Sequence, residues 1–131
     1  MEFTLTTKIK ATPKQIFKSW LSTQRHTKMI GSPAFVSDKV GETFTAGEGY
    51  ISGSNIELEP YKRIVQSWRS SDFKDDESDS QIEILLSEED EETTLTLKHT
   101  NVPESGDQYK TGWEEHYFAP MKAYFETLNK N

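Results

Sequence analysis

Residues 105–128 of the chain read SGDQYKTGWEEHYFAPMKAYFETL. Ser105 and Gln108 have the spacing of a capping box, in which two side chains bond to backbone N–H groups at a helix start. Apolar side chains then recur at steps of three and four residues, at Tyr109, Trp113, Tyr117, Met121, Tyr124 and Leu128. This spacing predicts an amphipathic helix of roughly twenty residues. Pro120 lies inside it, and we expect its ring to bend the helix near His116, because proline displaces a backbone hydrogen bond.

The segments before this helix alternate between apolar and polar residues, which is typical of half-buried strands. Strands are predicted at 2–11, 41–46, 50–59, 63–69, 80–86 and 93–99. Because turns and short loops join the last five, these strands describe an antiparallel meander. Gly53, inside the third strand, suggests a bulge or a bend.

Two short helices are predicted between the first and second strands. Thr12, Pro13 and Gln15 form a strong helix start. Threonine can cap a helix, proline suits the first helical position, and glutamine completes a capping box. Ser22 has the character of a second cap, and the helix that it opens is expected to end near Met29.

This order of elements predicts an α+β fold. A curved antiparallel sheet can turn its apolar face inward while the long C-terminal helix lies across the open side, with the two short helices beside it. The chain of 131 residues has the usual length of one domain, and no linker or internal repeat interrupts it. We therefore expect a single domain over residues 1–131, with a cavity between sheet and helix.

Composition excludes several classes of function. The net charge of −7 argues against binding to nucleic acid, which favours a basic face. The absence of cysteine excludes disulfides and thiolate chemistry. No apolar stretch approaches the ~20 residues that span a bilayer. We expect a cytoplasmic protein with no membrane contact and no nucleic-acid partner.

The acidic residues are unevenly distributed. Between residues 72 and 92 the chain has eleven acids against one base, Lys74. We interpret segments 72–79 and 88–92 as two acidic loops. Such runs usually form solvated loops, and the alternative is a docking surface for a basic protein partner.

A ligand-binding site is predicted where the apolar faces of the sheet and the C-terminal helix meet. Its residues are Trp20, Trp68, Ile84, Leu97, His99, Trp113, His116, Tyr117 and Met121. His99 and His116 are placed to converge on one cavity, in a structural role or in contact with a ligand, whereas His26 lies in a polar stretch and is expected to be solvated. The large rings favour a pocket for a small apolar ligand, and a fully packed core is the alternative.

No catalytic residue, metal site or cofactor site is predicted. The sequence has no cysteine nucleophile and no recognisable nucleophile–base pair. The His and Glu spacings typical of metal sites are absent. The glycines of segment 47–53 lie between strands, where no helix N-terminus can hold a phosphate. We therefore expect no enzymatic activity and no cofactor.

Several stretches, taken together, resemble one family. They are 12–17 (TPKQIF), 41–44 (GETF), 49–53 (GYISG), 58–60 (LEP), 63–65 (RIV), 68–69 (WR) and 112–118 (GWEEHYF), with Lys122 after the last. Their order and spacing resemble the C-terminal domain of the activator of the heat-shock-protein-90 ATPase (AHSA) and its stand-alone bacterial homologues. That family belongs to the START-like superfamily, also called SRPBCC or birch-pollen-allergen-like.

The resemblance implies a helix-grip fold without catalytic residues. Eukaryotic co-chaperones of this family carry an N-terminal domain and a linker ahead of this one, and both contact the chaperone. The sequence begins at the first strand, so we expect it to lack that N-terminal domain. Two functions remain open, with an enzyme of the cyclase or hydrolase kind as a minor third, since relatives in the superfamily carry out such chemistry. One is a non-catalytic module that holds a small apolar or amphipathic ligand between sheet and helix, and the other is a co-chaperone-like module that binds a protein partner.

Overall fold

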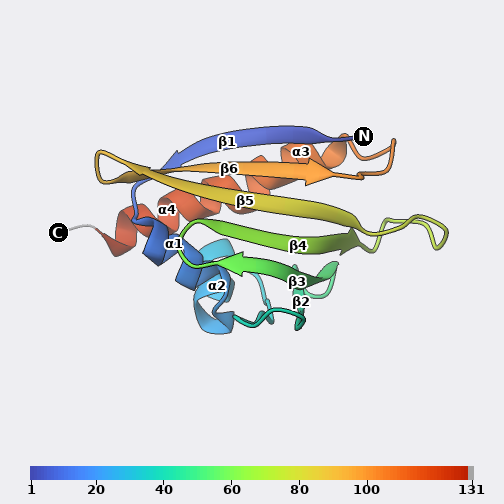
Figure 1. Cartoon of the computed structure of the whole chain (residues 1–131), viewed down its shortest axis with the longest axis horizontal. Helices are drawn as coiled ribbons and strands as arrows, with labels where there is room; N and C mark the ends of the chain where they lie inside the picture. The colour runs from blue at the N-terminus through green and yellow to red at the C-terminus, as the bar shows by residue number, and fades with distance from the viewer. Residues whose placement is uncertain (130–131) are drawn as a thin grey trace.

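Six antiparallel strands form a curved sheet in the computed structural model, which describes residues 1–129 (Figure 1). The strands are β1 (Phe3–Ile9), β2 (Thr43–Ala46), β3 (Ile51–Glu59), β4 (Arg63–Ser70), β5 (Ser80–Glu89) and β6 (Glu92–Thr100). Their order across the sheet is β1-β6-β5-β4-β3-β2. The predicted meander from β2 to β6 is therefore confirmed, and β1 pairs with β6 as an edge strand of the sheet.

Five helical elements accompany the sheet in this part of the chain. They are α1 (Pro13–Trp20), α2 (Thr23–Ile30), α3 (Gln108–Trp113), η1 (Glu114–Phe118) and α4 (Ala119–Leu128). The capping box between Thr12 and Gln15 is confirmed, and the Ser22 hydroxyl accepts a hydrogen bond from the Arg25 backbone N–H at the start of α2. The capping box predicted at Ser105 is wrong. Ser105 lies in a turn, and α3 begins at Gln108, after Asp107, without a side-chain cap.

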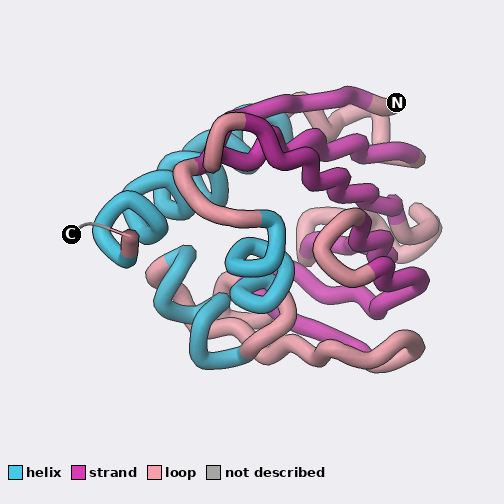
Figure 2. Tube along the Cα trace, turned by 60° about the vertical axis from the view of Figure 1, so that its left-hand side comes forward, coloured by secondary structure: helices cyan, strands magenta, loops and turns pink. Residues whose placement is uncertain are grey.

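The C-terminal helix, α3 to α4, lies across one face of the sheet, with α1 and α2 beside it (Figure 2). Alternate residues of β4, β5 and β6 point toward this helix and are fully or almost fully enclosed. They meet apolar side chains that the helix presents. The core cluster includes Ile64, Ile82, Ile84, Leu95, Leu97, Trp113, Phe118, Met121 and Phe125. This is the α+β helix-grip arrangement that the sequence predicts.

The helix is interrupted where the sequence predicts it. Residues Glu114–Phe118 form a π-helical turn, in which the Ala119 N–H bonds to the Glu114 carbonyl five residues earlier. Pro120 follows directly, at the start of α4. A proline in a regular α-helix would press its ring against the carbonyl of the fourth residue before it. The wider π-turn is one of the adjustments that relieve such a conflict.

Gly53 marks a close approach between strands. A Cβ built there would lie 1.9 Å from the backbone oxygen of Ser67, so only glycine fits. The bulge itself lies between Asn55 and Glu57, where the register of β3 against β4 shifts by one residue. The sequence therefore predicts the bulge in the right strand, a few residues away from the glycine.

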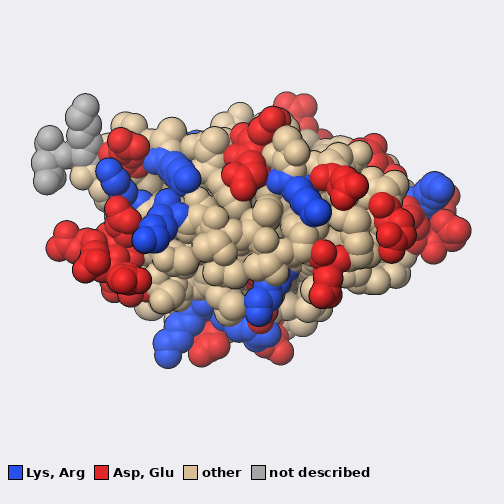
Figure 3. Space-filling model, turned by 90° about the horizontal axis from the view of Figure 1, so that it is seen from above, with Lys and Arg blue, Asp and Glu red and all other residues tan. Residues whose placement is uncertain are grey.

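The two acidic loops lie at opposite ends of the sheet. Loop 72–79 precedes β5, whereas segment 88–92 is the hairpin that joins β5 to β6. Only Asp90 and Glu91 of this predicted loop form the turn, since Glu88 and Glu89 belong to β5 and Glu92 to β6. The length of β5 separates the two segments by about 30 Å. Figure 1 shows the two loops at opposite ends of the long axis, and Figure 3 shows acidic side chains gathered at both ends. They cannot form one continuous docking surface.

Candidate functional site

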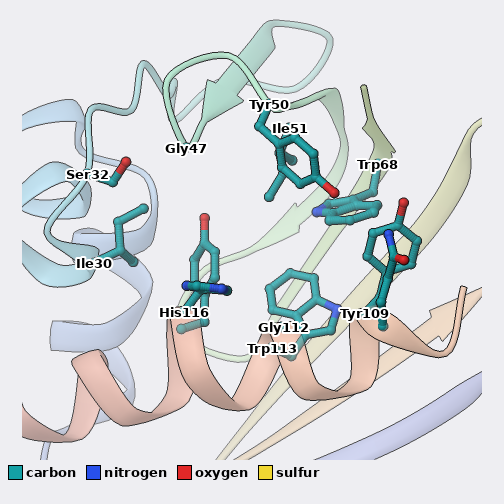
Figure 4. A pocket seen from close by; sticks show the side chains of 12 residues that line it. Ile30, Ser32, Gly47, Tyr50, Ile51, Trp68, Tyr109, Gly112, Trp113 and His116 are labelled. Atoms are coloured by element: carbon teal, nitrogen blue, oxygen red, sulfur yellow. The ribbon is translucent and has the colours of Figure 1, made fainter. Parts of the chain in front are cut away.

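A pocket of about 460 Å³ opens between the C-terminal helix and the turn that joins β2 to β3 (Figure 4). The helix supplies one wall, with Gln108, Tyr109, Gly112, Trp113, His116 and Tyr117. The opposite wall comes from three separate segments. They contribute Ile30 and Ser32 at the end of α2, Gly47, Tyr50 and Ile51 at the turn and the start of β3, and Trp68 of β4.

Aromatic rings dominate this pocket. The ring centroids of Trp68 and Trp113 are 5.8 Å apart, and that of Tyr109 is 5.1 Å from Trp68. Tyr117 continues the series, 5.0 Å from Trp113. Rings arranged in this way offer flat apolar faces on which a planar or apolar molecule can stack.

A hydrogen-bonded bridge closes one end of the pocket. The Tyr50 hydroxyl donates to Asp72, and the Gln108 amide donates to the same carboxylate oxygen at 3.3 Å. Partial burial and the bond to Asp72 raise the pKa of Tyr50 to about 12, so its phenol stays neutral near pH 7. Asp72 thus joins the β2–β3 turn to the start of α3 and places a negative charge at this end of the pocket.

The structure divides the predicted site residues into three groups. Trp68, Trp113, His116 and Tyr117 line the pocket. Trp20 borders a void of about 10 Å³ behind it, which Trp68, Trp113 and Tyr117 also border. The remaining four predicted residues, Ile84, Leu97, His99 and Met121, are fully enclosed in the core and do not line the pocket.

His99 and His116 do not converge. His116 is exposed at the pocket, on the π-turn, whereas His99 is enclosed behind Trp113. The His99 Nδ1 accepts a hydrogen bond from the Trp113 indole at 3.1 Å, because an indole N–H can only donate. The proton of the neutral ring therefore lies on Nε2, 2.8 Å from the Ser80 hydroxyl. Burial lowers the pKa of His99 to about 4.

The pairing of Ser80 with His99 is not that of a nucleophile with its base. The Ser80 hydroxyl donates its own proton to the Trp68 carbonyl oxygen at 2.7 Å and accepts from the His99 Nε2–H. A general base would have to present an unprotonated nitrogen to this hydroxyl. Both side chains are also buried, away from any substrate. The pair is therefore a structural one.

The expectation that His26 is solvated is wrong. This side chain is only 2% exposed, and its Nδ1 lies 2.7 Å from the Trp20 carbonyl oxygen. A carbonyl only accepts, so Nδ1 carries the proton and Nε2 accepts from the Tyr117 hydroxyl at 2.8 Å. Burial lowers the pKa of His26, and the hydrogen bond that its Nδ1–H donates to the Trp20 carbonyl opposes this shift. The missed signal is the three-residue spacing of His26 and Met29, which places both on the buried face of α2.

Several pocket residues were not predicted from the sequence. Tyr50 and Ile51 were assigned only to a strand, and Tyr109 only to the helix stripe. Gly112 carried a usable signal, because a glycine inside a helix is unfavourable and often has a packing or functional reason. A Cβ built on Gly112 meets no atom within 4 Å, so the residue leaves open space on the pocket wall.

No group of three or more His, Asp or Glu side chains among residues 1–129 is placed to hold a metal ion. Within the same residues, no helix is long and apolar enough to cross a membrane.

The fold and the pocket together define a START-like helix-grip protein. A family model described as "Activator of Hsp90 ATPase homolog 1-like protein" matches residues 10–126. The chain therefore belongs to this family.

Two curated relatives are named as activators of the 90 kDa heat shock protein ATPase. The human activator of 90 kDa heat shock protein ATPase homolog 1 is 23% identical over 114 residues, which are 86% of this chain and 33% of that protein. The mouse homolog 2 is 25% identical over 128 residues, which are 97% of this chain and 38% of that protein. The chain thus spans about a third of the length of these curated relatives.

A solved structure is similar over nearly its whole length. The crystal structure of an HSP90 activator from Plasmodium falciparum is 25% identical in sequence and superimposes with a TM-score of 0.84. The similarity covers 95% of each chain.

Proposed function

We propose that the chain is a non-catalytic binding module that holds a small apolar or amphipathic molecule in the pocket beside its C-terminal helix. The observation that carries this proposal is the open volume of about 460 Å³ with aromatic walls. Ligand pockets of proteins have volumes of roughly 300–1,000 Å³, apolar walls and a few polar groups that fix orientation. Here the aromatic rings supply the apolar walls, and Ser32, His116 and the Trp68 indole supply such polar groups.

The hydrophobic effect can supply useful affinity in such a pocket. Apolar burial contributes roughly 25 cal/mol per Å², and a micromolar complex needs about 8 kcal/mol after the entropic cost of association. A two-ring molecule enclosed by Trp68, Trp113 and Ile51 buries apolar surface on both of its faces. We therefore expect dissociation constants in the micromolar range for apolar aromatic probes.

The test fills the pocket without disturbing the core. In Gly112→Leu the new side chain occupies open space on the pocket wall, since no atom lies within 4 Å of its Cβ position. The matched control is Thr111→Leu, an exposed neighbour that does not line the pocket. Fluorescence titration with the uncharged probe N-phenyl-1-naphthylamine measures binding to both variants and to the wild type.

We expect micromolar binding to the wild type and to Thr111→Leu, and at least about ten-fold weaker binding to Gly112→Leu. Equal binding to all three proteins would place the probe elsewhere and contradict the proposal. The same conclusion would follow if nothing bound to the wild type below about a millimolar.

A co-chaperone-like function is the second candidate, and the family supports it. The named relatives are activators of the 90 kDa heat-shock protein ATPase, and the Plasmodium falciparum structure is described as an HSP90 activator. We propose that the chain docks on such a chaperone through one of its acidic loops. Calorimetry with a purified 90 kDa heat-shock protein tests this directly, and Gly112→Leu should bind the chaperone as the wild type does if the pocket is not the docking surface.

A further inference from the structure

The indole N–H of Trp68 differs from those of the other two tryptophans. Trp20 donates to the Gln66 side chain at 3.2 Å, and Trp113 donates to His99. For Trp68 Nε1 the described part of the chain, residues 1–129, provides no hydrogen-bond partner, although this residue is only 4% exposed.

This N–H faces the pocket. Every fully enclosed side-chain nitrogen and oxygen among residues 1–129 has a hydrogen-bond partner. Because Trp68 Nε1 has none, it is not fully enclosed. The Trp68 side chain borders the pocket of about 460 Å³ and, behind it, the void of about 10 Å³. Figure 4 shows the indole nitrogen on the side of the ring that is turned toward the middle of the pocket.

A donor in this position selects among ligands. Covering it with an apolar group would leave a buried N–H unsatisfied, which is unfavourable, whereas an acceptor on the ligand satisfies it. The rings around it belong to Trp113 and Tyr109, which leave flat faces beside the donor. The acceptor should therefore lie at the edge of a planar molecule.

The charge of the ligand is also restricted. Asp72 lies at one end of the pocket, held by Tyr50 and Gln108, both of which line it. The whole chain carries a net charge of −7. An anionic ligand would meet repulsion from both, so a neutral acceptor fits better than a carboxylate.

We infer that the pocket prefers uncharged planar aromatic molecules that carry a hydrogen-bond acceptor at their edge, a ring nitrogen or a carbonyl oxygen, and that the Trp68 Nε1–H donates to this acceptor. This inference rests on the proposed ligand-binding function and names the chemistry of the ligand. It makes Trp68 the residue that determines specificity.

Two probes of the same shape separate recognition of the acceptor from stacking. Naphthalene and quinoline are planar two-ring molecules that differ in one ring nitrogen, the acceptor. Titrations of ¹⁵N-labelled wild type follow the three indole N–H signals, which single Trp→Phe variants assign. We expect quinoline to move the Trp68 signal downfield relative to its position with naphthalene, because only quinoline accepts a hydrogen bond.

The variant Trp68→Phe keeps an aromatic ring and removes the donor. We expect the ratio of the quinoline Kd to the naphthalene Kd to rise about three- to ten-fold in this variant, the effect of losing one hydrogen bond. The ratio cancels a general loss of affinity from altered packing. If Trp68→Phe fails to fold, the wild-type shifts alone decide the question.

The outcomes distinguish this inference from the function on which it rests. If both probes bind the wild type but shift the Trp68 signal alike, or if Trp68→Phe leaves the ratio unchanged, the pocket binds by stacking alone and the inference is wrong. If neither probe binds, or both bind Gly112→Leu as they bind the wild type, the proposed function fails and the inference fails with it.

Discussion

Trp113 and Tyr117, one turn apart on the C-terminal helix, each donate a hydrogen bond to a buried histidine. Trp113 donates to His99 on β6, and Tyr117 donates to His26 on α2. The two histidines use opposite tautomers, yet both present an unprotonated nitrogen to the helix. Protonation of His99 would set its Nδ1–H against the Trp113 indole N–H, which can only donate, whereas the Tyr117 hydroxyl can turn and accept from a protonated His26.

This arrangement predicts a loss of stability in mild acid. The pKa of His99 is lowered to about 4 in the folded protein, while an unfolded histidine titrates near 6.5. Between these two values the unfolded chain binds more protons than the folded one, so the free energy of unfolding falls as the pH falls. Over the whole window His99 accounts for about 3 kcal/mol.

Urea unfolding between pH 7 and pH 4 measures this effect. Carboxylates also titrate in this range, so the informative quantity is the difference between wild type and His99→Gln, which should lose stability less steeply. The exposed His116→Gln is the control and should follow the wild type. Parallel curves for wild type and His99→Gln would show that His99 is not held neutral.

At the level of single residues, the sequence predicts which side chains are buried better than it predicts their hydrogen-bond partners. The inward position of His99 follows from its parity in a strand, and Trp68, Trp113 and Tyr117 follow from spacing. His26 was misjudged because its neighbours along the chain are polar, while its hydrogen-bond partners lie in other elements. Neither the Tyr117 hydroxyl nor the Trp20 carbonyl can be assigned to His26 before the helices are packed.

The π-turn keeps the C-terminal helix facing the sheet. From Tyr109 to Phe125 an uninterrupted α-helix turns by about 100° per residue and would leave these two side chains roughly 160° apart. Both are buried against the same core. The extra residue of the π-turn Glu114–Phe118 takes back part of this rotation, so both halves of the helix present apolar side chains to the sheet.

The effect of removing the π-turn on the free energy of unfolding should depend on whether Pro120 is present. Deleting Glu115, an exposed residue of the turn, would leave a regular α-helix with both flanks in place. Pro120 would then lie in an α-helical interior, where proline costs about 3 kcal/mol. We expect the deletion to lower the free energy of unfolding by about this amount more with Pro120 than in the Pro120→Ala background. Urea unfolding of the four proteins measures the difference, and additive effects would contradict the coupling.

Two glycines make a matched pair for a second test. Gly53→Ala places a Cβ within 1.9 Å of the Ser67 backbone oxygen, and we expect it to destabilise the protein by at least about 3 kcal/mol, the upper end of overpacking. Gly112→Ala meets no atom within 4 Å and should stabilise the helix by up to about 1 kcal/mol. Thermal melts of both variants measure these two changes in stability. A mild effect at Gly53 would mean that β3 can move away from β4.

At the level of elements, the sequence predicts nearly all of the fold. All six strands and the three helical regions follow from periodicity and capping, with ends shifted by a few residues. The short strand β2 begins at Thr43 rather than Gly41, because Gly41 has a positive φ of 88° and lies in a turn. Pro120 predicts where the helix is interrupted. That the interruption is a π-turn could not be predicted, because this depends on which side chains must face the sheet.

The pocket belongs to the whole molecule. Its walls come from residues 30–32, 47–51, 68 and 108–117, which no local pattern connects. The sequence predicts an apolar site between sheet and helix. In the structure the open volume lies toward the β2–β3 turn, and the interior behind Trp113 holds only a void of about 10 Å³. Ile84, Leu97 and Met121 are therefore core residues in this structure, although their inward direction was predicted correctly.

The two acidic loops lie too far apart on the molecule to act as one docking surface. Exposed charges are screened beyond about 8 Å at physiological ionic strength, far less than the length of β5, so each loop acts independently. In loop 72–79, Asp72, Glu77 and Asp79 already bond within the protein. Within residues 1–129, the carboxylates of 88–92 form no side-chain hydrogen bond or ion pair. Segment 88–92 is therefore the better candidate for docking on a basic partner.

We expect this difference to appear in chaperone binding, if the co-chaperone-like function is correct. Glu88→Gln/Glu89→Gln and Asp75→Asn/Asp76→Asn each remove two exposed charges, one pair from each acidic segment. Rim charges act mainly on the association rate. At low salt the first variant should associate with a 90 kDa heat-shock protein several-fold more slowly than the wild type, and the second should resemble the wild type. Stopped-flow measurements at low and physiological salt test this, and the difference should shrink as salt rises. Equal slowing by both pairs would indicate an effect of net charge alone, and no slowing by either would leave both loops without a docking role.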